Sequence, residues 1–293
     1  MKIGVYAKSV KDKKHGEAVL RLVDLLSAHE HRVWTTPHIE DFVRMHNSEV
    51  ELTVFDSFHK GNAPIDVIFS IGGDGTILET LQIIKDSGIP VLSINTGRLG
   101  FLAGFTEEKM EKALFELEKG NYTTEKRSLL HLDSSNDIFE FNYALNDFVI
   151  HKKETSSMII VHAYLNGEFL NSYWSDGLII ATPTGSTGYS LSCGGPIIFP
   201  KSDSFVITPI APHNLNVRPV IVPDNSVVSF EIEGRASSYL ASLDSRSESI
   251  TDQVSMAVKR ADFDLNLIRL NEINFLETLR GKLNWGFDKR STH

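Results

Sequence analysis

One carboxylate, Asp74, stands among three glycines in the stretch IGGDGTIL, residues 71–78, directly after an apolar run. Glycines in such a turn let a ligand come close to the backbone, and the free amides at a helix start favour an anion such as phosphate. A carboxylate beside a phosphate is repulsive unless it accepts a proton from an attacking hydroxyl or helps to hold a metal. The stretch therefore predicts a phosphoryl-transfer site. Its predicted phosphate cradle consists of Gly72, Gly73, Gly75 and Thr76.

A simpler interpretation of the same residues stays open, a tight turn with a helix-capping aspartate. The sequence contains no GxxxxGK[ST] loop, and no GxGxxG pattern follows a strand. Neither the P-loop nor the common dinucleotide fingerprint can therefore hold the ligand.

A second glycine-rich stretch, SDGLIIATPTGSTGYSLSCGGPIIFP, covers residues 175–200 and carries seven hydroxyl groups on serine and threonine. Uncharged hydroxyls suit the edge of a nucleoside, and Tyr189 offers a flat face on which a base can stack. Hydroxyl-rich turns of a β domain are the alternative. Asn146 and Asp147 can read an adenine edge and ribose hydroxyls, or they can cap a turn. Asp176, just before Gly177, can be a turn residue.

The elements that must position these residues divide the chain in two. Up to residue 120, short apolar runs such as IDVIFSI and PVLSIN alternate with helical segments, which predicts an α/β domain with a parallel, Rossmann-like sheet. Residues 121–268 contain many short strands with turn signals, including an Asn166-Gly167 hairpin, and predict a predominantly β domain. Residues 269–293 return to helical spacing and predict a terminal helix that packs on the first domain, with Ile273, Leu276, Leu279 and Leu283 on one side.

Composition narrows the function classes. The 293 residues carry a formal net charge of −9, which argues against a nucleic-acid or anionic-membrane partner. The single cysteine, Cys193, excludes an intramolecular disulfide framework and a cysteine-based zinc site. No stretch approaches the roughly 20 apolar residues of a membrane span, and the first residues contain no long apolar signal segment. We expect a cytoplasmic protein.

Taken together, the motifs resemble those of the NAD kinase family. The resemblance rests on IGGDGTIL (71–78), INTGRLGFL (94–102), ALND (144–147), DGLIIATPTGSTGYSLSCGGPI (176–197), TPIAPHNLNVRP (208–219), LDSR (243–246) and FLETLRGKLNW (275–285). Diacylglycerol-type lipid kinases share GGDGT, but they lack the TPTGST segment.

The resemblance implies that Asp74 is the general base that takes the proton from the 2′-hydroxyl of the adenosine ribose of NAD. ATP would be the phosphoryl donor, and Mg²⁺ or another divalent metal would arrive with ATP, without a metal site of the protein's own. The resemblance also implies a homodimer or a homotetramer. The implied NAD-binding residues are Asp74, Gly75, Asn146, Asp147, Trp174, Asp176, Thr187, Gly188, Tyr189, Ser190, Leu191, Ser192 and Arg246.

Several residues depart from the usual family pattern. Asp147 stands where glutamate is usual, Gly188 where alanine is usual, and Arg246 where an amide is common. Trp174 occupies a position that many bacterial members fill with arginine and that bears on the preference between NAD and NADH. Two alternatives remain, a diacylglycerol-type lipid kinase and a non-catalytic dinucleotide sensor. A sensor would have no use for a base in the phosphate cradle.

Overall fold

The computed structural model describes residues 1–46, 49–97, 100–102, 104–153, 158–270 and 275–285. The chain folds into two compact units. The first unit consists of Met1–Lys126 together with Leu265–His293, and the second unit is Arg127–Asp264. The divisions therefore lie at residues 126 and 264, whereas the sequence predicted them at 120 and 268. The difference arises because the strand Leu265–Arg269 pairs with the first unit's sheet.

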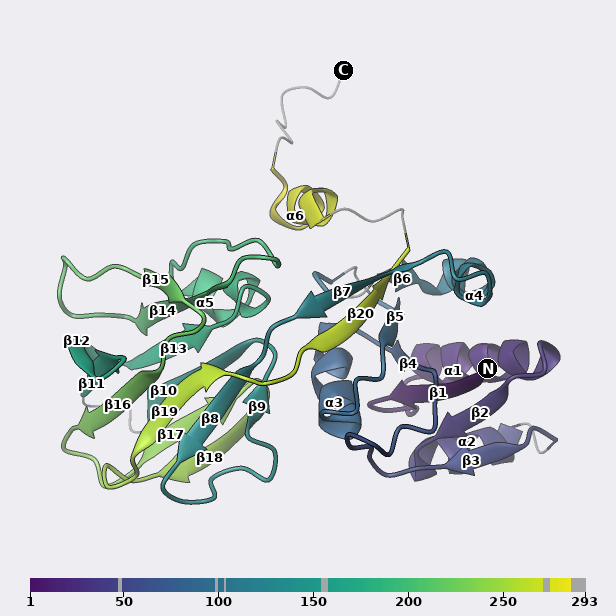
Figure 1. The fold of residues 1–293 in the computed structure, drawn as a ribbon, viewed down its shortest axis with the longest axis horizontal. Helices are drawn as coiled ribbons and strands as arrows, with labels where there is room; N and C mark the ends of the chain where they lie inside the picture. The colour runs from purple at the N-terminus through teal and green to yellow at the C-terminus, as the bar shows by residue number, and fades with distance from the viewer. Residues whose placement is uncertain (47–48, 98–99, 103, 154–157, 271–274, 286–293) are drawn as a thin grey trace. The chain divides into compact units, whose positions relative to one another are not determined.

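The first unit is built on one large sheet (Figure 1). Its strands are β1 (Lys2–Ala7), β2 (Arg32–Thr35), β3 (Leu52–Val54), β4 (Val67–Ile71), β5 (Val91–Asn95), β6 (Phe105–Thr106), β7 (Thr123–Arg127) and β20 (Leu265–Arg269). Its helices are α1 (Lys13–Ala28), α2 (Pro37–His46), α3 (Asp74–Ile84), the 3₁₀ helix η1 (Glu107–Lys109), α4 (Met110–Glu118) and α6 (Phe275–Leu283).

The strand order is β3-β2-β1-β4-β5-β20-β7, and β1 pairs in parallel with both β2 and β4. The chain thus runs outward from β1 in one direction and from β4 in the other. In such doubly wound sheets, ligands bind beyond the carboxyl ends of the strands where the order reverses. The β4–α3 turn, which carries Asp74, lies at that edge.

Helices lie on both faces of this sheet. Alternate residues of a strand point to opposite faces. Phe69 of β4 belongs to the apolar core that also contains Leu22 of α1 and Leu114 of α4. The neighbouring Ser70 instead accepts a hydrogen bond from Thr80 Oγ1 of α3, at 2.9 Å. The predicted α/β domain with a parallel sheet is therefore confirmed.

The second unit is entirely antiparallel in its paired strands and consists of two six-stranded sheets. The sheets have the orders β15-β14-β13-β10-β17-β18 and β12-β11-β16-β19-β8-β9. The strands are β8 (Leu130–Ser134), β9 (Tyr143–Ala144), β10 (Asp147–Lys152), β11 (Ile159–Leu165), β12 (Glu168–Ser175), β13 (Gly177–Ala181), β14 (Ser204–Ile210), β15 (Val220–Pro223), β16 (Val228–Glu233), β17 (Tyr239–Leu243), β18 (Arg246–Ile250) and β19 (Met256–Arg260).

The two sheets bury a shared apolar core. Phe148 and Ile180 of one sheet and Val161 and Phe230 of the other belong to the same cluster. The hairpin between β11 and β12 turns at Asn166 and Gly167, with φ of 53° and 84°, as the sequence predicted. The predicted β-rich second domain is confirmed.

The glycine-rich stretch begins with β13 of the first of these sheets, and the residues after β13 cover the outer face of that sheet. It contains the 3₁₀ helix η2 (Gly185–Thr187) and the short helix α5 (Tyr189–Ser192). Ile198 packs with Val149, Ile179 and Val206 in a second apolar cluster, distinct from the core between the sheets. The apolar residues of this stretch therefore anchor it, while its hydroxyls line the turns.

The terminal helix α6 differs from its predicted packing. Thr278 and Leu279 are buried, whereas Leu276 is exposed, so the predicted apolar side is wrong at that residue; Ile273 lies outside the described residues. The ring of Phe275 lies 6.4 Å from that of Phe101, centroid to centroid, within the first unit. Among the described helices, none is long and apolar enough to cross a membrane.

Candidate active site

The turn between β4 and α3 places Asp74 at the first position of α3, after Gly73 as N-cap, so Asp74 is not the capping residue of this helix. Gly72 has φ +148°, and a Cβ there would lie 2.1 Å from Thr76 Oγ1. A Cβ on Gly73 or Gly75 would meet no described atom within 4 Å. Only Gly72 is thus required by packing, and the other two glycines leave the backbone approachable.

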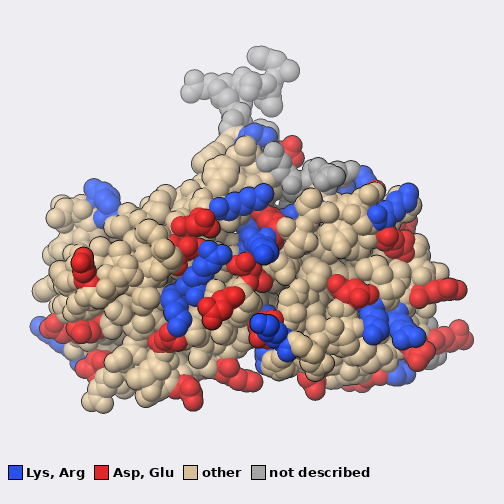
Figure 2. Space-filling model, viewed as in Figure 1, with Lys and Arg blue, Asp and Glu red and all other residues tan. Residues whose placement is uncertain are grey.

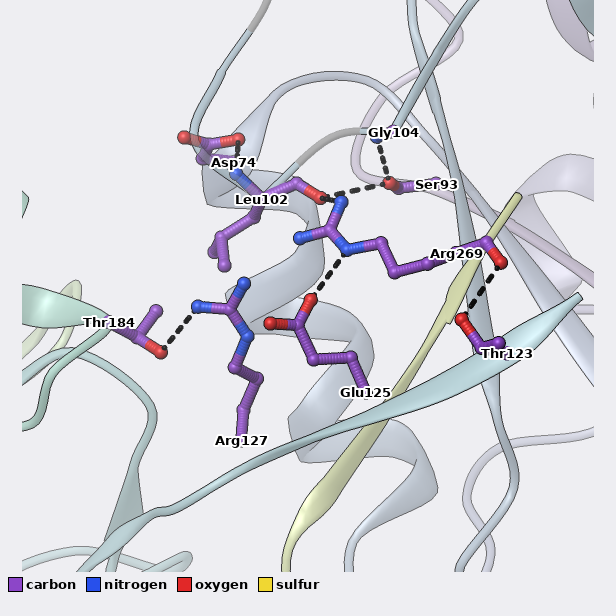
Figure 3. Close-up of polar contacts among 9 residues, drawn as sticks. All are labelled: Asp74, Ser93, Leu102, Gly104, Thr123, Glu125, Arg127, Thr184 and Arg269. Carbon is purple, nitrogen blue, oxygen red and sulfur yellow. Dashed lines mark hydrogen bonds and ion pairs between the residues drawn. The ribbon is translucent and has the colours of Figure 1, made fainter. Parts of the chain in front are cut away.

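The carboxylate of Asp74 is held by a segment that the sequence reasoning did not assign to the site. Phe101 N–H donates to Oδ2 at 2.7 Å. Leu102 N–H donates to Oδ1 at 3.1 Å (Figure 3). A Cβ on Gly100 would lie 1.8 Å from Oδ1, so only glycine fits there. The signal was present in the stretch INTGRLGFL, but nothing in its pattern says that its amides face Asp74.

In the second unit, a buried turn presents Asn146 and Asp147. The backbone amides of Leu145, Asn146 and Asp147 donate to the carboxylate of Asp244, at 2.9, 2.7 and 3.2 Å. Asp244 has φ 53°, and its own amide donates to the carbonyl of Asp147 at 3.0 Å. Asp244 therefore fixes the backbone that carries the two predicted NAD-binding residues, a role that the sequence did not reveal.

The TPTGST stretch packs against the same turn from the other side. Thr182 Oγ1 donates to the carbonyl of Leu145 at 2.5 Å, and Thr182 N–H donates to the carbonyl of Asn146 at 2.9 Å. A Cβ on Gly185 would lie 2.0 Å from the Asn146 carbonyl oxygen, so glycine is required. Thr184 accepts a hydrogen bond at 3.2 Å from Nη1 of the buried Arg127, which the sequence analysis also missed.

Asp147 has an unusual charge state. Its side chain is 7% exposed, and burial, together with the nearby charge of Asp244, raises its pKa to about 7. Burial also raises the pKa of Asp244, against the opposing effects of three amide donors and of Arg246. Near neutral pH the Asp147 carboxyl can therefore both donate and accept hydrogen bonds.

Tyr189 lies near two of the predicted carboxylates. Its side chain is 42% exposed, as a stacking platform must be. Burial raises the pKa of its hydroxyl, and Cys193, Asp147 and Asp176 add to the shift, so these groups are close enough to interact. Asp176 pairs with Lys152 Nζ at 2.7 Å. Asp147 therefore acts electrostatically on Tyr189 of the glycine-rich stretch, which also contains Asp176.

Other predicted NAD-binding residues are placed differently. The Ser190 hydroxyl is buried and lies 2.8 Å from Thr208 Oγ1. The Arg246 guanidinium donates to the carbonyls of Phe141 and Tyr143, so it orders a loop of the second unit. The Trp174 side chain is 47% exposed. Four further predicted NAD-binding residues lie in the glycine-rich stretch. Thr187 and Leu191 are partly buried, and Gly188 and Ser192 are exposed.

A metal-ligating arrangement occurs elsewhere. Within the described part of the chain, at least three metal-ligating side chains converge only at His29, His31 and Glu118. His29 Nδ1 and His31 Nε2 each lie 2.9 Å from Glu118 Oε1, so both imidazole rings form a hydrogen bond with this carboxylate. None of the three is on an element that carries a predicted site residue.

Comparison with known proteins bears on the whole chain. The profile of the ATP-NAD kinase N-terminal domain matches residues 10–122, and that of the ATP-NAD kinase C-terminal domain matches residues 145–270. An NAD kinase of Cytophaga hutchinsonii is 54% identical over 227 residues, 77% of this chain and 78% of that protein. An NAD kinase of Christiangramia forsetii is 42% identical over 298 aligned positions, 99% of this chain and 100% of that protein.

Two solved structures share the fold. Yeast NADH kinase complexed with NADH has a TM-score of 0.88 at 24% identity, and the match covers 100% of this chain and 90% of that one. An NAD kinase from Archaeoglobus fulgidus in complex with ATP has a TM-score of 0.73 at 26% identity, covering 97% and 99%. The profile matches and the identity to full-length relatives together show that this chain belongs to the ATP-NAD kinase family.

Proposed function

We propose that this protein transfers the γ-phosphoryl group of ATP to the 2′-hydroxyl of the adenosine ribose of NAD, and so produces NADP and ADP. The observation that carries the proposal is the Asp74 carboxylate, which two backbone amides orient at the carboxyl end of a parallel strand. Family membership supports both the reaction and the phosphoryl donor. The ATP complex of the related Archaeoglobus fulgidus enzyme also supports ATP as the donor.

Asp74 acts in this proposal as the general base. The ribose oxygen attacks the γ-phosphorus, the bond from that phosphorus to the β–γ bridging oxygen breaks, and ADP leaves with the electron pair. The hydroxyl proton passes to Asp74. Positioning and neutralisation of phosphate charge supply most of the acceleration.

The predicted NAD contacts remain proposals, and the geometry supports them unequally. Asn146, Asp147, Asp176 and Tyr189 suit the adenosine, because ribose hydroxyls need hydrogen-bonding partners and the base needs a flat exposed face. Gly72, Gly73, Gly75 and Thr76 suit phosphate at the start of α3. Ser190 would contribute through its backbone N–H, because its hydroxyl is buried against Thr208 and its carbonyl accepts from the amides of Cys193 and Gly195.

The metal, the assembly and the location belong to the same proposal. Mg²⁺ or another divalent metal would enter with ATP and neutralise charge on the phosphates. We propose a cytoplasmic homodimer or homotetramer without a nucleic-acid or membrane partner. Lysines, arginines and acidic residues are interspersed on the face seen in Figure 2, which fits small anionic substrates better than a nucleic acid.

The test is the formation of NADP from NAD, ATP and Mg²⁺. A coupled assay measures it for the wild type and for Asp74→Asn. We expect wild-type turnover and a loss of about 10²–10⁴-fold in the variant, the usual contribution of a general base. Asp74→Asn should still bind NAD in calorimetry. Near-normal turnover in the variant would remove Asp74 as the base.

Two alternative outcomes point to other functions. NAD binding without turnover by any phosphoryl donor would favour a dinucleotide sensor. Phosphorylation of a lipid hydroxyl in place of NAD would favour the lipid kinase.

A further inference from the structure

Leu102 connects the Asp74 carboxylate to an arginine on the last strand of the sheet. Its N–H donates to Asp74 Oδ1 at 3.1 Å, and its carbonyl accepts a hydrogen bond from Arg269 Nη1 at 3.2 Å (Figure 3). We propose that Arg269, held by Glu125, is a positioning residue that sets the orientation of Asp74 for proton transfer. This inference rests on the proposed function, because it assumes that Asp74 is the base.

The arginine is itself fixed by a partly buried ion pair. Arg269 Nε lies 2.7 Å from Glu125 Oε2, and the two side chains are 16% and 17% exposed. Because both side chains are largely buried, solvent screens the attraction between them only weakly. The 2.7 Å distance is that of a charge-assisted hydrogen bond. The planar guanidinium donates through Nε to Glu125 and through Nη1 to Leu102 at once. A lysine ammonium is a compact charge on a flexible stem and cannot reproduce this fork.

The backbone around Leu102, which links Asp74 to Arg269, is held in place by further contacts. The Leu102 carbonyl also accepts from Ser93 Oγ at 3.3 Å, and Ser93 Oγ accepts from Gly104 N–H at 2.8 Å. Gly100 approaches the carboxylate so closely that no side chain fits. A displacement of the Leu102 backbone therefore also moves the amides of Phe101 and Leu102, which orient the Asp74 carboxylate.

A purely structural role for the ion pair makes a different prediction. Glu125 lies on β7 and Arg269 on β20, which are adjacent strands. If the pair only joined these strands, its loss would lower stability and leave the turnover of the folded protein unchanged. A positioning role instead lowers kcat in folded protein, with little change in the KM for NAD.

The experiment compares Arg269→Met and Arg269→Lys with Arg260→Met as matched control. Arg260 pairs with Asp224 in the second unit, and its described partners, Asp203, Asp224 and Asp264, include no proposed site residue. We expect kcat to fall about 100-fold in Arg269→Met, the scale of a small misplacement of a reacting group. Arg269→Lys should lose about tenfold, and the KM for NAD should stay within about twofold in both. Arg260→Met should keep wild-type kcat, and thermal melts should confirm that all variants are folded.

A double-mutant cycle with Asp74→Asn separates the two roles. If Arg269 acts through Asp74, Arg269→Met should cost less than about threefold in the Asp74→Asn background. An equal loss in both backgrounds, or a wild-type kcat in folded Arg269→Met, would overturn the positioning role. If Arg269→Met does not fold, Arg269→Lys carries the same cycle. Absence of NADP from the wild type would instead overturn the proposed function, and this inference with it.

Discussion

At the scale of single residues, the carboxyl pair Asp147 and Asp244 stands out in the second unit. The Asp244 carboxylate accepts hydrogen bonds from three backbone amides and so holds the turn that carries Asn146 and Asp147. Asp147 has no such set of amide donors among its described contacts, and its pKa is raised to about 7 by burial and by the charge of Asp244. One carboxyl of the pair therefore organises the backbone, and the other is poised to change charge near neutral pH.

The raised pKa of Asp147 predicts a dependence of stability on pH. Between about pH 4 and pH 7 the folded state keeps a proton that the unfolded state has lost, so stability falls as pH rises through this window. The shift of about three pKa units corresponds to at most about 4 kcal/mol. Denaturant unfolding of wild type and Asp147→Asn from pH 4 to 8 measures it. The wild type should lose stability relative to the variant as pH rises, and a constant difference would contradict the assignment.

At the scale of elements, the β4–α3 connection uses its three glycines for different purposes. Gly72 has positive φ and sits against Thr76, so the turn itself depends on it. Gly75 lies inside the first turn of α3, where glycine disfavours the helix relative to alanine. Because its Cβ position is open among the described residues, the fold does not explain this glycine, whereas a ligand that approaches the backbone would.

This division predicts opposite effects of two alanine substitutions. Gly72→Ala should lower the free energy of unfolding by about 1–3 kcal/mol through overpacking against Thr76. Gly75→Ala should leave stability unchanged or raise it by up to about 1 kcal/mol. In Gly75→Ala the KM for NAD should rise about 5-fold to 100-fold, if the methyl group costs about 1–3 kcal/mol against the ligand. Denaturant melts and the coupled assay measure the two quantities.

The control is Gly281→Ala in α6, where a Cβ also meets no described atom within 4 Å. It should gain helix stability without changing the KM for NAD. If Gly75→Ala matched Gly281→Ala in both measurements, the backbone at Gly75 would have no role in binding.

At the scale of the whole molecule, the two units differ in how they use the chain. The second unit is one continuous segment with its own core between two sheets. The first unit is completed only when the chain returns as β20, which lies between β5 and β7 in the sheet. The first unit therefore lacks an internal strand until the last part of the chain is present.

This arrangement predicts different behaviour of two fragments. Residues 127–264 expressed alone should fold with a cooperative thermal transition, because their core and both sheets are complete. Residues 1–126 should not, because the missing β20 leaves β5 and β7 without their shared neighbour. Circular dichroism melts of both fragments give the answer. A cooperative transition in 1–126 would show that β20 is dispensable for the first unit.

Much of the architecture could be predicted because it depends on local pattern. The alternation of apolar runs and helical spacing predicted the parallel sheet, and Asn166-Gly167 predicted a hairpin whose two residues need positive φ. The glycines around Asp74 predicted a turn, and that turn lies between β4 and α3. The end of helix α3 depends on more than local pattern. The helix ends at Ile84, and the next residue, Lys85, takes φ 47°.

By itself, the sequence determined the class of each domain, the family, and the residue types available for chemistry, because these depend on composition and on short patterns. Only the tertiary structure decided what holds those residues in place. The amides of Phe101 and Leu102 on Asp74, the contact of Arg269 with Leu102, and Asp244 beneath Asn146 join positions 27 to 167 residues apart. Such pairings depend on which strands become neighbours, and no periodicity within a segment encodes that choice.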